Sequence, residues 1–275
     1  MIKLLNPKNL PISVTAFGLL GFLLRLWTLS GGTDKENLHI PVPAAWIALW
    51  IVTALVPLLI IYITKPLADP VKYNLNFPAS PVSAVGTLCG ALAVSLAGVR
   101  SFSNSTDVLM LITGLLGMAS GVVLLMAGYA RLKGMRVNFL YHGIPCLFMA
   151  LHIFNQCKQW SNVPHSSPFL FGFLCQICAM LAVYQLCAFD VDMGKRRASL
   201  FWSLMSVYFC LVALPTADNL IFCGCIAVWM LTNLCSLRPA KKRKPAAQEA
   251  PKPVQAHMSG SDVSIDEIKS WLDEE

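Results

Sequence analysis

Charge is scarce in this chain and unevenly distributed along it. Only 13% of the 275 residues are charged and 56% are hydrophobic, whereas a soluble domain normally carries about 25% charged residues. Seven of the 14 acidic residues fall after position 237, so the first 237 residues hold seven acids against 14 Lys and Arg. This composition argues against a soluble globular domain and indicates that lipid surrounds most of the chain.

Recognisable catalytic motifs are also missing. The sequence has no P-loop, no G-x-G-x-x-G, no H-E-x-x-H and no G-x-S-x-G. We therefore expect neither an enzyme nor a bound cofactor. No Asp, Glu or Lys lies near the centre of an apolar segment, and such groups usually serve as relays in ion-coupled transporters. An ion-coupled mechanism is accordingly not expected.

Long apolar segments are what the sequence has instead. A helix that crosses the hydrocarbon core needs about 20 mostly apolar residues. Eight segments approach or exceed this length, and they are uncharged apart from Arg25 in the first. The sequence thus predicts an all-α, polytopic transmembrane helix bundle with about eight spans. The predicted spans are 12–29, 43–63, 82–99, 108–129, 137–154, 169–189, 198–214 and 220–237.

The positive residues predict how the spans run. Cytosolic loops of membrane proteins carry an excess of Lys and Arg, and in the eight-span arrangement every second connection is basic. The opposite connections hold only Lys35, Arg100 and Lys158. Both termini are therefore predicted to be cytosolic, with the first span retained rather than cleaved. The compact loops and basic inner face favour a bacterial cytoplasmic membrane, and the excess of positive charge needs no nucleic-acid partner.

Small residues recur at helical spacing in the third and fourth spans. Gly86, Gly90 and Ala93 share a face of one span, and Gly114, Gly117 and Gly121 share a face of the next. Such spacing allows two helix backbones to approach closely in lipid. Close helix packing is the favoured interpretation, and a glycine-lined hinge or solute path is the alternative.

Polar side chains within the spans are the candidate site residues. A pathway for a small neutral solute could be lined by His142, His152, Gln156, Gln176 and Gln185. Helix-to-helix hydrogen bonds are the competing interpretation of such residues. The arrangement of spans also places Arg25, Asp107 and Asp218 at the same outer level, where Arg25 either forms an ion pair with one of the acids or extends towards the interface.

Ten cysteines are scattered through the chain, mostly within spans. Cysteine and histidine are ligands for soft metals, and candidates for such a site in the outer half are His152, Cys175, Cys178, Cys223 and Cys225. A free cysteine more often behaves as a small hydrophobic residue, and this interpretation is favoured. No metal is therefore expected.

The composition changes abruptly after the last span. Residues 1–237 form the predicted membrane domain, 238–257 a basic linker rich in Pro, Ala and Lys, and 258–275 an acidic tail. In the tail, an apolar stripe at helical spacing consists of Ile265, Ile268, Trp271 and Leu272. This stripe predicts docking to a groove of a cytosolic protein, or else the tail is a disordered, solubilising end.

Two functions follow from these features. The first is a permease-like carrier of a small, neutral solute, because packed helices with polar groups between them often surround a pathway. The second is a non-catalytic membrane scaffold or assembly factor that recruits a cytosolic partner through the tail. The scarcity of charge within the spans favours a neutral solute or a scaffold.

Overall fold

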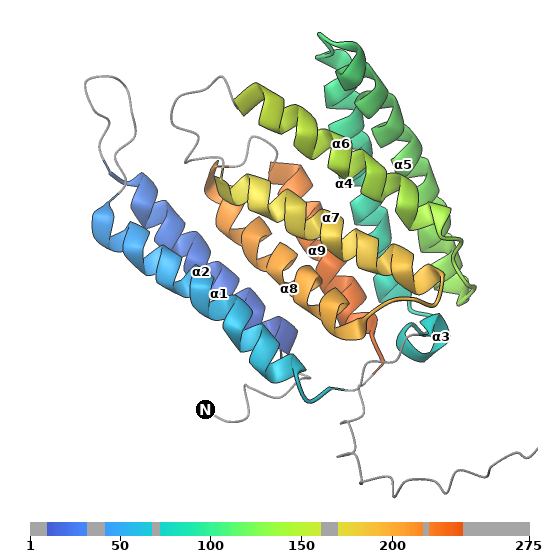
Figure 1. Ribbon diagram of the computed structural model, residues 1–275, viewed down its shortest axis with the longest axis horizontal. Coiled ribbons are helices and arrows are strands. Elements are labelled where there is room, and N and C mark those ends of the chain that lie inside the picture. Colours follow the sequence, from blue (N-terminus) through green and yellow to red (C-terminus); the bar gives the residue numbers. More distant parts are fainter. Residues whose placement is uncertain (1–9, 32–41, 68–71, 161–169, 217–219, 239–275) are drawn as a thin grey trace, which may run out of the picture. The chain divides into compact units, whose positions relative to one another are not determined.

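Eight helices of 17 to 26 residues form the described part of the chain. The computed structural model describes residues 10–31, 42–67, 72–160, 170–216 and 220–238, and the regular elements within them are helical, which confirms the all-α prediction (Figure 1). Each of the eight matches one predicted segment. They are α1 (Leu10–Leu29), α2 (Pro43–Thr64), α4 (Pro81–Ser103), α5 (Val108–Lys133), α6 (Leu140–Trp160), α7 (Leu170–Asp190), α8 (Arg196–Ala213) and α9 (Leu220–Ser236). A single turn, α3 (Tyr73–Asn76), and a short 3-10 helix, η2 (Leu214–Thr216), complete the set.

Local sequence signals explain several helix ends. Proline occupies the first turn of α2 and α4, where its missing N–H would have no helical partner in any case. The hydroxyl of Ser80 caps α4 by accepting a hydrogen bond from the Ser83 amide at 3.3 Å. Helix α5 ends at Gly134, whose φ of +69° is left-handed and is adopted most readily by glycine.

The sixth helix in the chain, α6, differs most from its predicted span, which covered 137–154. It begins three residues later and continues to Trp160. Asn138 marks the start, because its side-chain oxygen accepts a hydrogen bond from the Leu140 amide. Cys157 lies beyond the predicted span of 137–154, which implied a loop, and this was wrong: it is an exposed residue of the helix. Hydropathy ended the span too early because the last helical turns are polar.

The helices alternate in direction. A hydrogen bond from the Ser80 amide to the Arg131 carbonyl joins the start of α4 to the end of α5. At the opposite end, the Val42 amide donates to the Thr28 carbonyl, which joins α1 to α2. The end of the bundle with the start of α4 and the end of α5 carries most of the described cations, and we call it the basic end. We call the opposite end the far end. The described cations of the basic end are Lys65, Lys72, Arg131, Lys133, Arg136, Lys195, Arg196, Arg197 and Arg238.

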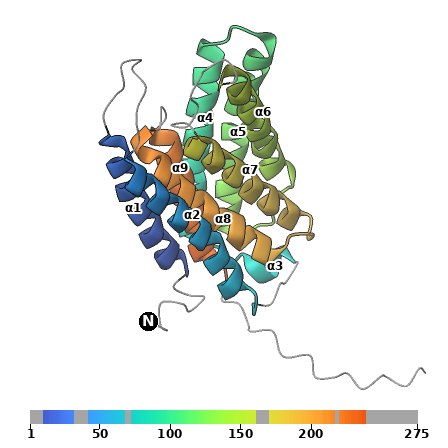
Figure 2. The same ribbon diagram turned by 60° about the vertical axis from the view of Figure 1, so that its left-hand side comes forward.

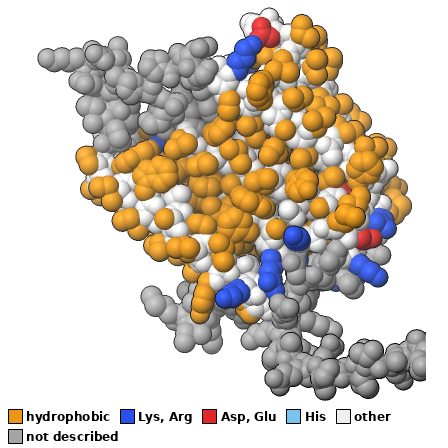
Figure 3. Space-filling view, viewed as in Figure 1, with side chains coloured by type: hydrophobic (Ala, Val, Ile, Leu, Met, Phe, Trp, Pro, Cys, Tyr) orange, Lys and Arg blue, Asp and Glu red, His pale blue; other side chains and the backbone are white. Residues whose placement is uncertain are grey.

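Apolar surface identifies the surroundings of this bundle. Helices α1, α2, α4, α5 and α7 are each long and apolar enough to cross a membrane. Large hydrophobic side chains are exposed along them, for example Leu58 at 63% and Val122 at 60%. Hydrophobic side chains cover most of the face in Figure 3, and Lys and Arg gather near its lower edge. Soluble monomers rarely expose such continuous apolar surface, so the chain is a multi-pass integral membrane protein in contact with lipid. The count of eight spans and the cytosolic position of the basic end stay predictions.

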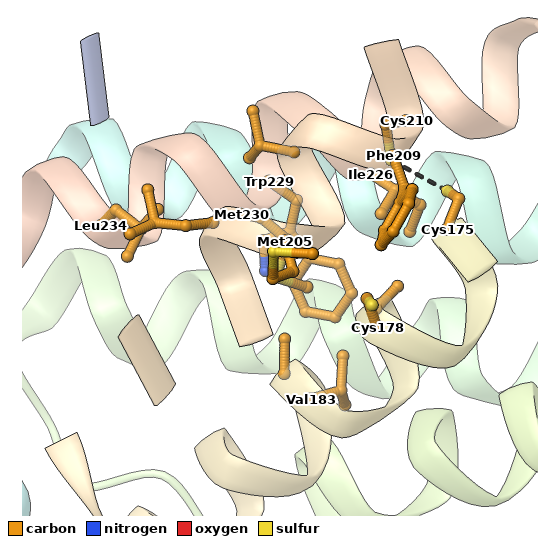
Figure 4. Packing of buried hydrophobic residues seen from close by; sticks show 14 of the residues in the cluster. Cys175, Cys178, Val183, Met205, Phe209, Cys210, Ile226, Trp229, Met230 and Leu234 are labelled. Atoms are coloured by element: carbon orange, nitrogen blue, oxygen red, sulfur yellow. Dashed lines mark hydrogen bonds between the residues drawn. The ribbon is translucent and has the colours of Figure 1, made fainter. Parts of the chain in front are cut away.

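Helix α8 is surrounded by protein rather than lipid. It packs against α1, α2, α7 and α9 (Figure 2), and most of its side chains are buried. This position explains why its sequence tolerates serines such as Ser203 and Ser206 and why the hydroxyl groups of Tyr208 and Thr53 can meet at 2.9 Å. Large side chains from α7, α8 and α9 fill the space between these three helices, with Phe209 and Trp229 among them (Figure 4).

The glycines of α5 confirm the prediction of close helix packing. A methyl group on Gly98 of α4 would lie 2.7 Å from the backbone nitrogen of Met118, and one on Gly117 would lie 2.6 Å from the Cα of Gly98. The two backbones therefore touch, as small residues allow. On α4, Gly86 and Gly90 instead face Thr232 and Trp229 of α9. The glycine faces thus pack α4 against two neighbours.

Candidate functional site

A buried hydrogen-bonded pair of side chains joins α6 to α7 at the basic end. His142 Nδ1 and Asp190 Oδ2 lie 2.6 Å apart, and their side chains are 1% and 0% exposed. A carboxylate can only accept hydrogen bonds, so the Nδ1–H of His142 donates to it. Buried ionisable groups are costly and are pointers to function. The sequence singled out His142 but not Asp190.

Arg131, in the last turn of α5, is the second charge of this region. Its side chain is buried, and its guanidinium carbon lies 4.1 Å from the ring centroid of Phe77 and 5.4 Å from that of Tyr73. Such stacking stabilises a cation by attraction to the ring faces. Burial raises the pKa of the Tyr73 phenol, against a smaller lowering by Arg131, so Tyr73 stays neutral. Asp190, which interacts electrostatically with Arg131, is thus the counter-charge. Arg131, His142 and Asp190 are called the buried charge cluster below.

The segment after α7 braces this cluster. Arg136 donates from Nε and Nη2 to the backbone carbonyl of Asp190, at 3.3 and 3.0 Å. Its Nη2 also forms an ion pair with Asp192 Oδ2 at 2.8 Å. The other carboxylate oxygen of Asp192 accepts the amide N–H of Tyr73 at 2.8 Å, which anchors α3. Asp192 has a φ of +57°, a conformation that Asp adopts more readily than most residues.

Several polar atoms of the cluster are buried without a partner. Arg131 Nε and Nη1 and Asp190 Oδ1 have no hydrogen-bonding partner among the residues that the structure describes. An open cavity of about 520 Å³ adjoins Asp190 and is lined by Arg136, Val137, Asn138, Phe139, Asp190 and Val191. Because an unpaired buried polar group costs about 1–3 kcal/mol, and more when charged, these atoms are the strongest indication of a binding site.

A second set of polar groups lies towards the far end of α6 and α7. Asn155 donates from Nδ2 to Thr113 Oγ1 at 2.8 Å, and Gln156 donates from Nε2 to His152 Nε2 at 3.2 Å. The His152 ring stacks on Phe148 with the centroids 5.5 Å apart. The side-chain oxygens of Asn155, Gln156 and Gln176 are buried, with no partner found in the described ranges. We call these three residues the far-end amides.

The predicted polar lining therefore divides between the two ends. His142 belongs to the buried charge cluster, whereas His152 and Gln156 lie together near the far end. Gln176 lies in the far half of α7. The side-chain oxygen of Gln185 accepts the amide N–H of Lys195 at 3.5 Å, near the basic end. The five residues do not form one site, and whether they line a pathway stays a prediction.

The residues of the predicted outer ion pair have different surroundings. Arg25 is buried, with its guanidinium carbon 5.7 Å from the ring centroid of Trp46 and 5.2 Å from that of Phe171. It therefore lies against aromatic rings rather than extending to the interface. Asp107 forms an ion pair with Lys158 at the end of α6. Asp218 lies outside the described residues, so a pair between Arg25 and Asp218 stays a prediction.

Several of the cysteines form an apolar cluster, which includes Cys210, a residue that the sequence did not suggest. Cys175 Sγ lies 3.0 Å from Cys210 Sγ of α8 (Figure 4), and Cys223 is a further hydrogen-bonding partner of Cys175. Cys178 is buried beside them, while Cys225 is only partly buried. Within the described residues, no three His, Cys, Asp or Glu side chains are arranged to hold a metal ion. Packing as small hydrophobic groups accounts for these thiols.

The predicted docking stripe of the tail, which comprises Ile265, Ile268, Trp271 and Leu272, lies outside the described residues. Docking to a cytosolic protein, and with it the scaffold function, stays a prediction. No family model, no curated protein and no solved structure matches the sequence. A function can therefore be proposed only from the site itself, since a fold alone does not imply one.

Proposed function

We propose that this membrane protein is a permease-like carrier of a small polar solute without net charge. One observation carries the proposal: among the described residues, buried polar atoms without partners lie on α5 and α7 at the basic end and on α6 and α7 at the far end. At the basic end these atoms belong to Arg131 and Asp190, and at the far end they belong to the amides. A solute that enters at one end and leaves at the other would satisfy each set in turn.

The charges of the cluster support a solute that is neutral overall. Arg131 and Asp190 carry opposite charges, and the neutral Tyr73, which interacts with both, adds none. A solute with net charge would leave an unbalanced charge in a buried site, where such a charge is strongly unfavourable. The far-end amides are uncharged hydrogen-bonding groups and place the same restriction on the solute. Both ends thus favour the same class of solute.

The packing between the two sets is compatible with a carrier. Between them, Phe148 and Met149 of α6 are buried, and the Cys146 thiol lies 3.9 Å from the backbone oxygen of Met180 on α7. A carrier needs a closed middle, because a site open to both sides would conduct rather than alternate. Movement of α6 and α7 relative to each other would then expose one set at a time.

Uptake profiling of a deletion strain of the source organism tests this proposal. The strain is complemented with the wild-type chain, with Gln176→Leu and with Gln159→Leu, and depletion of uncharged and zwitterionic metabolites from the medium is compared. Gln159 is an exposed amide of α6 and is the matched control. We expect the wild-type and Gln159→Leu chains to restore uptake of a solute that Gln176→Leu does not restore. Equal uptake of every metabolite with and without the wild-type chain would overturn the proposal.

A further inference from the structure

We infer that the buried charge cluster binds a zwitterion of the amino-acid type, with its carboxylate on Arg131 and its ammonium group on Asp190. The inference deepens the proposed function, on which it rests for the carriage of the solute, by naming the chemical class. It follows from which atoms of the cluster already form hydrogen bonds and which have no partner among the described residues.

The guanidinium of Arg131 has its face against an aromatic ring, whereas two of its nitrogens have no acceptor among the described residues. Phe77 lies under the face, 4.1 Å from the guanidinium carbon. Guanidinium N–H groups point outward in the plane of the group, so stacking does not block them. Nε and Nη1 are both buried without an acceptor in the described part of the chain. Two buried N–H donors on a cation are suited to a carboxylate, because charge-assisted hydrogen bonds are the stronger kind.

The carboxylate of Asp190 is engaged on one side only. Its Oδ2 accepts the hydrogen bond from His142, and its backbone carbonyl is held by Arg136. These contacts fix the carboxylate in one orientation and leave Oδ1 buried, with no partner among the described residues. An ammonium group supplies three N–H donors and a positive charge, which is the chemistry that this oxygen lacks.

The two charges do not satisfy each other directly. Arg131 and Asp190 interact electrostatically, but no ion pair joins them among the described residues. A ligand with one charge would satisfy one partner and leave the other unpaired. A zwitterion satisfies both and adds no net charge. A site built to hydrogen-bond two groups of a solute strongly disfavours an analogue that lacks one of them.

The adjoining cavity reaches the cluster at Asp190, and a ligand would enter from there. Asp190 lies on its wall together with Arg136, Asn138 and Phe139. The cavity of about 520 Å³ falls within the usual range of about 300–1,000 Å³ for small-molecule sites. It is therefore large enough for an amino acid with a side chain.

Calorimetric titration of the purified full-length protein tests the inference. The probes are alanine and leucine, each compared with its amide, which lacks the carboxylate, and with the deaminated acid, which lacks the ammonium group. We expect at least one amino acid to bind, and its two analogues to bind at least about tenfold more weakly, which corresponds to about 1.4 kcal/mol. Because this comparison uses the wild-type chain, it does not depend on the folding of any variant.

Variants assign the binding to the cluster. We expect Asp190→Asn and Arg131→Gln to weaken amino-acid binding by at least about tenfold, and Lys133→Gln, which removes an exposed cation from the same helix end, to leave it unchanged. Each variant must elute as a single species in size-exclusion chromatography, which shows that it is folded. The inference is wrong if no probe binds, which is the result expected when water alone fills the cluster. It is also wrong if the amides bind as tightly as the amino acids.

The inference and the proposed function can fail separately. Binding of an amino acid in vitro without any uptake in cells would leave the inference standing and contradict carriage. Uptake of an uncharged solute such as a polyol, without amino-acid binding, would support carriage and contradict the inference.

Discussion

The two ends of α6 and α7 bury polar groups in different ways. At the basic end, Asp190 is supported by His142 and Arg136, and Arg131 rests on aromatic rings. At the far end, each hydrogen-bonded amide has one side-chain partner, as Asn155 has in Thr113. Formal charges are far more costly to bury than amides, so they need more supporting contacts. The basic end therefore combines rigidity with unpaired charge, which suits selective binding, whereas the far end suits weaker and less specific contact.

The largest expected effect comes from removing one charge of the cluster. Replacing Asp190 with Leu removes the acceptor of the His142 hydrogen bond and the carboxylate that interacts electrostatically with Arg131. Leaving a buried charge uncompensated in this way typically costs about 3–5 kcal/mol. We expect Arg131→Leu to be similarly destabilising, because it leaves Asp190 uncompensated. The free energy of unfolding, measured by denaturant titration in mixed micelles, gives both values.

The double variant Asp190→Leu, Arg131→Leu is the control for this prediction. It removes both charges, so that neither is left uncompensated, and replacing buried charges together by apolar residues is often nearly neutral. Its loss of stability should thus be smaller than the sum of the two single losses. Strict additivity would mean that the two charges do not depend on each other.

The next effect compares the two histidines of α6. His142→Asn removes a hydrogen bond to a buried carboxylate, a kind that contributes about 1.5–3 kcal/mol. His152→Asn loses a hydrogen bond to the neutral Gln156, a kind that contributes about 0.5–1.5 kcal/mol. The same titration should therefore rank His142→Asn as the more destabilising. A reversed order would show that stacking of His152 on Phe148 outweighs the charge at the basic end.

The sequence predicted the helices far better than it predicted the cluster. Apolar length alone located all eight helices, and the alternation of cations anticipated which helix ends lie together. His142 and Asp190, however, are 48 positions apart, and no periodicity within one helix relates them. Asp190 was visible as one of only seven acids before residue 238, but it lay just beyond its predicted span. Arg131 was counted only as a loop cation, because hydropathy cannot distinguish an exposed arginine from one stacked on Phe77.

A smaller effect is expected for the exposed ion pair at the far end. The side chains of Lys158 and Asp107 are 60% and 47% exposed, and solvent-exposed pairs contribute about 0.2–1 kcal/mol. Lys158→Ala should therefore lower the free energy of unfolding only slightly. The difference from wild type should shrink further as salt is added, because salt screens exposed charges. A loss comparable to that of Asp190→Leu would contradict the distinction between exposed and buried charge in this bundle.

The smallest change in stability is expected for Gln176→Leu, and this variant separates packing from function. Its side-chain oxygen is buried without a described partner, so the native chain already bears the cost of desolvating it. Replacing such a group by an apolar one of similar size can be neutral or stabilising. If Gln176 bonded helix to helix, the same variant would instead lose about 0.5–1.5 kcal/mol. An unchanged or higher stability together with lost uptake would mean that the amide contacts a solute. If Gln176 served packing alone, a substitution that leaves the fold intact would not lower uptake.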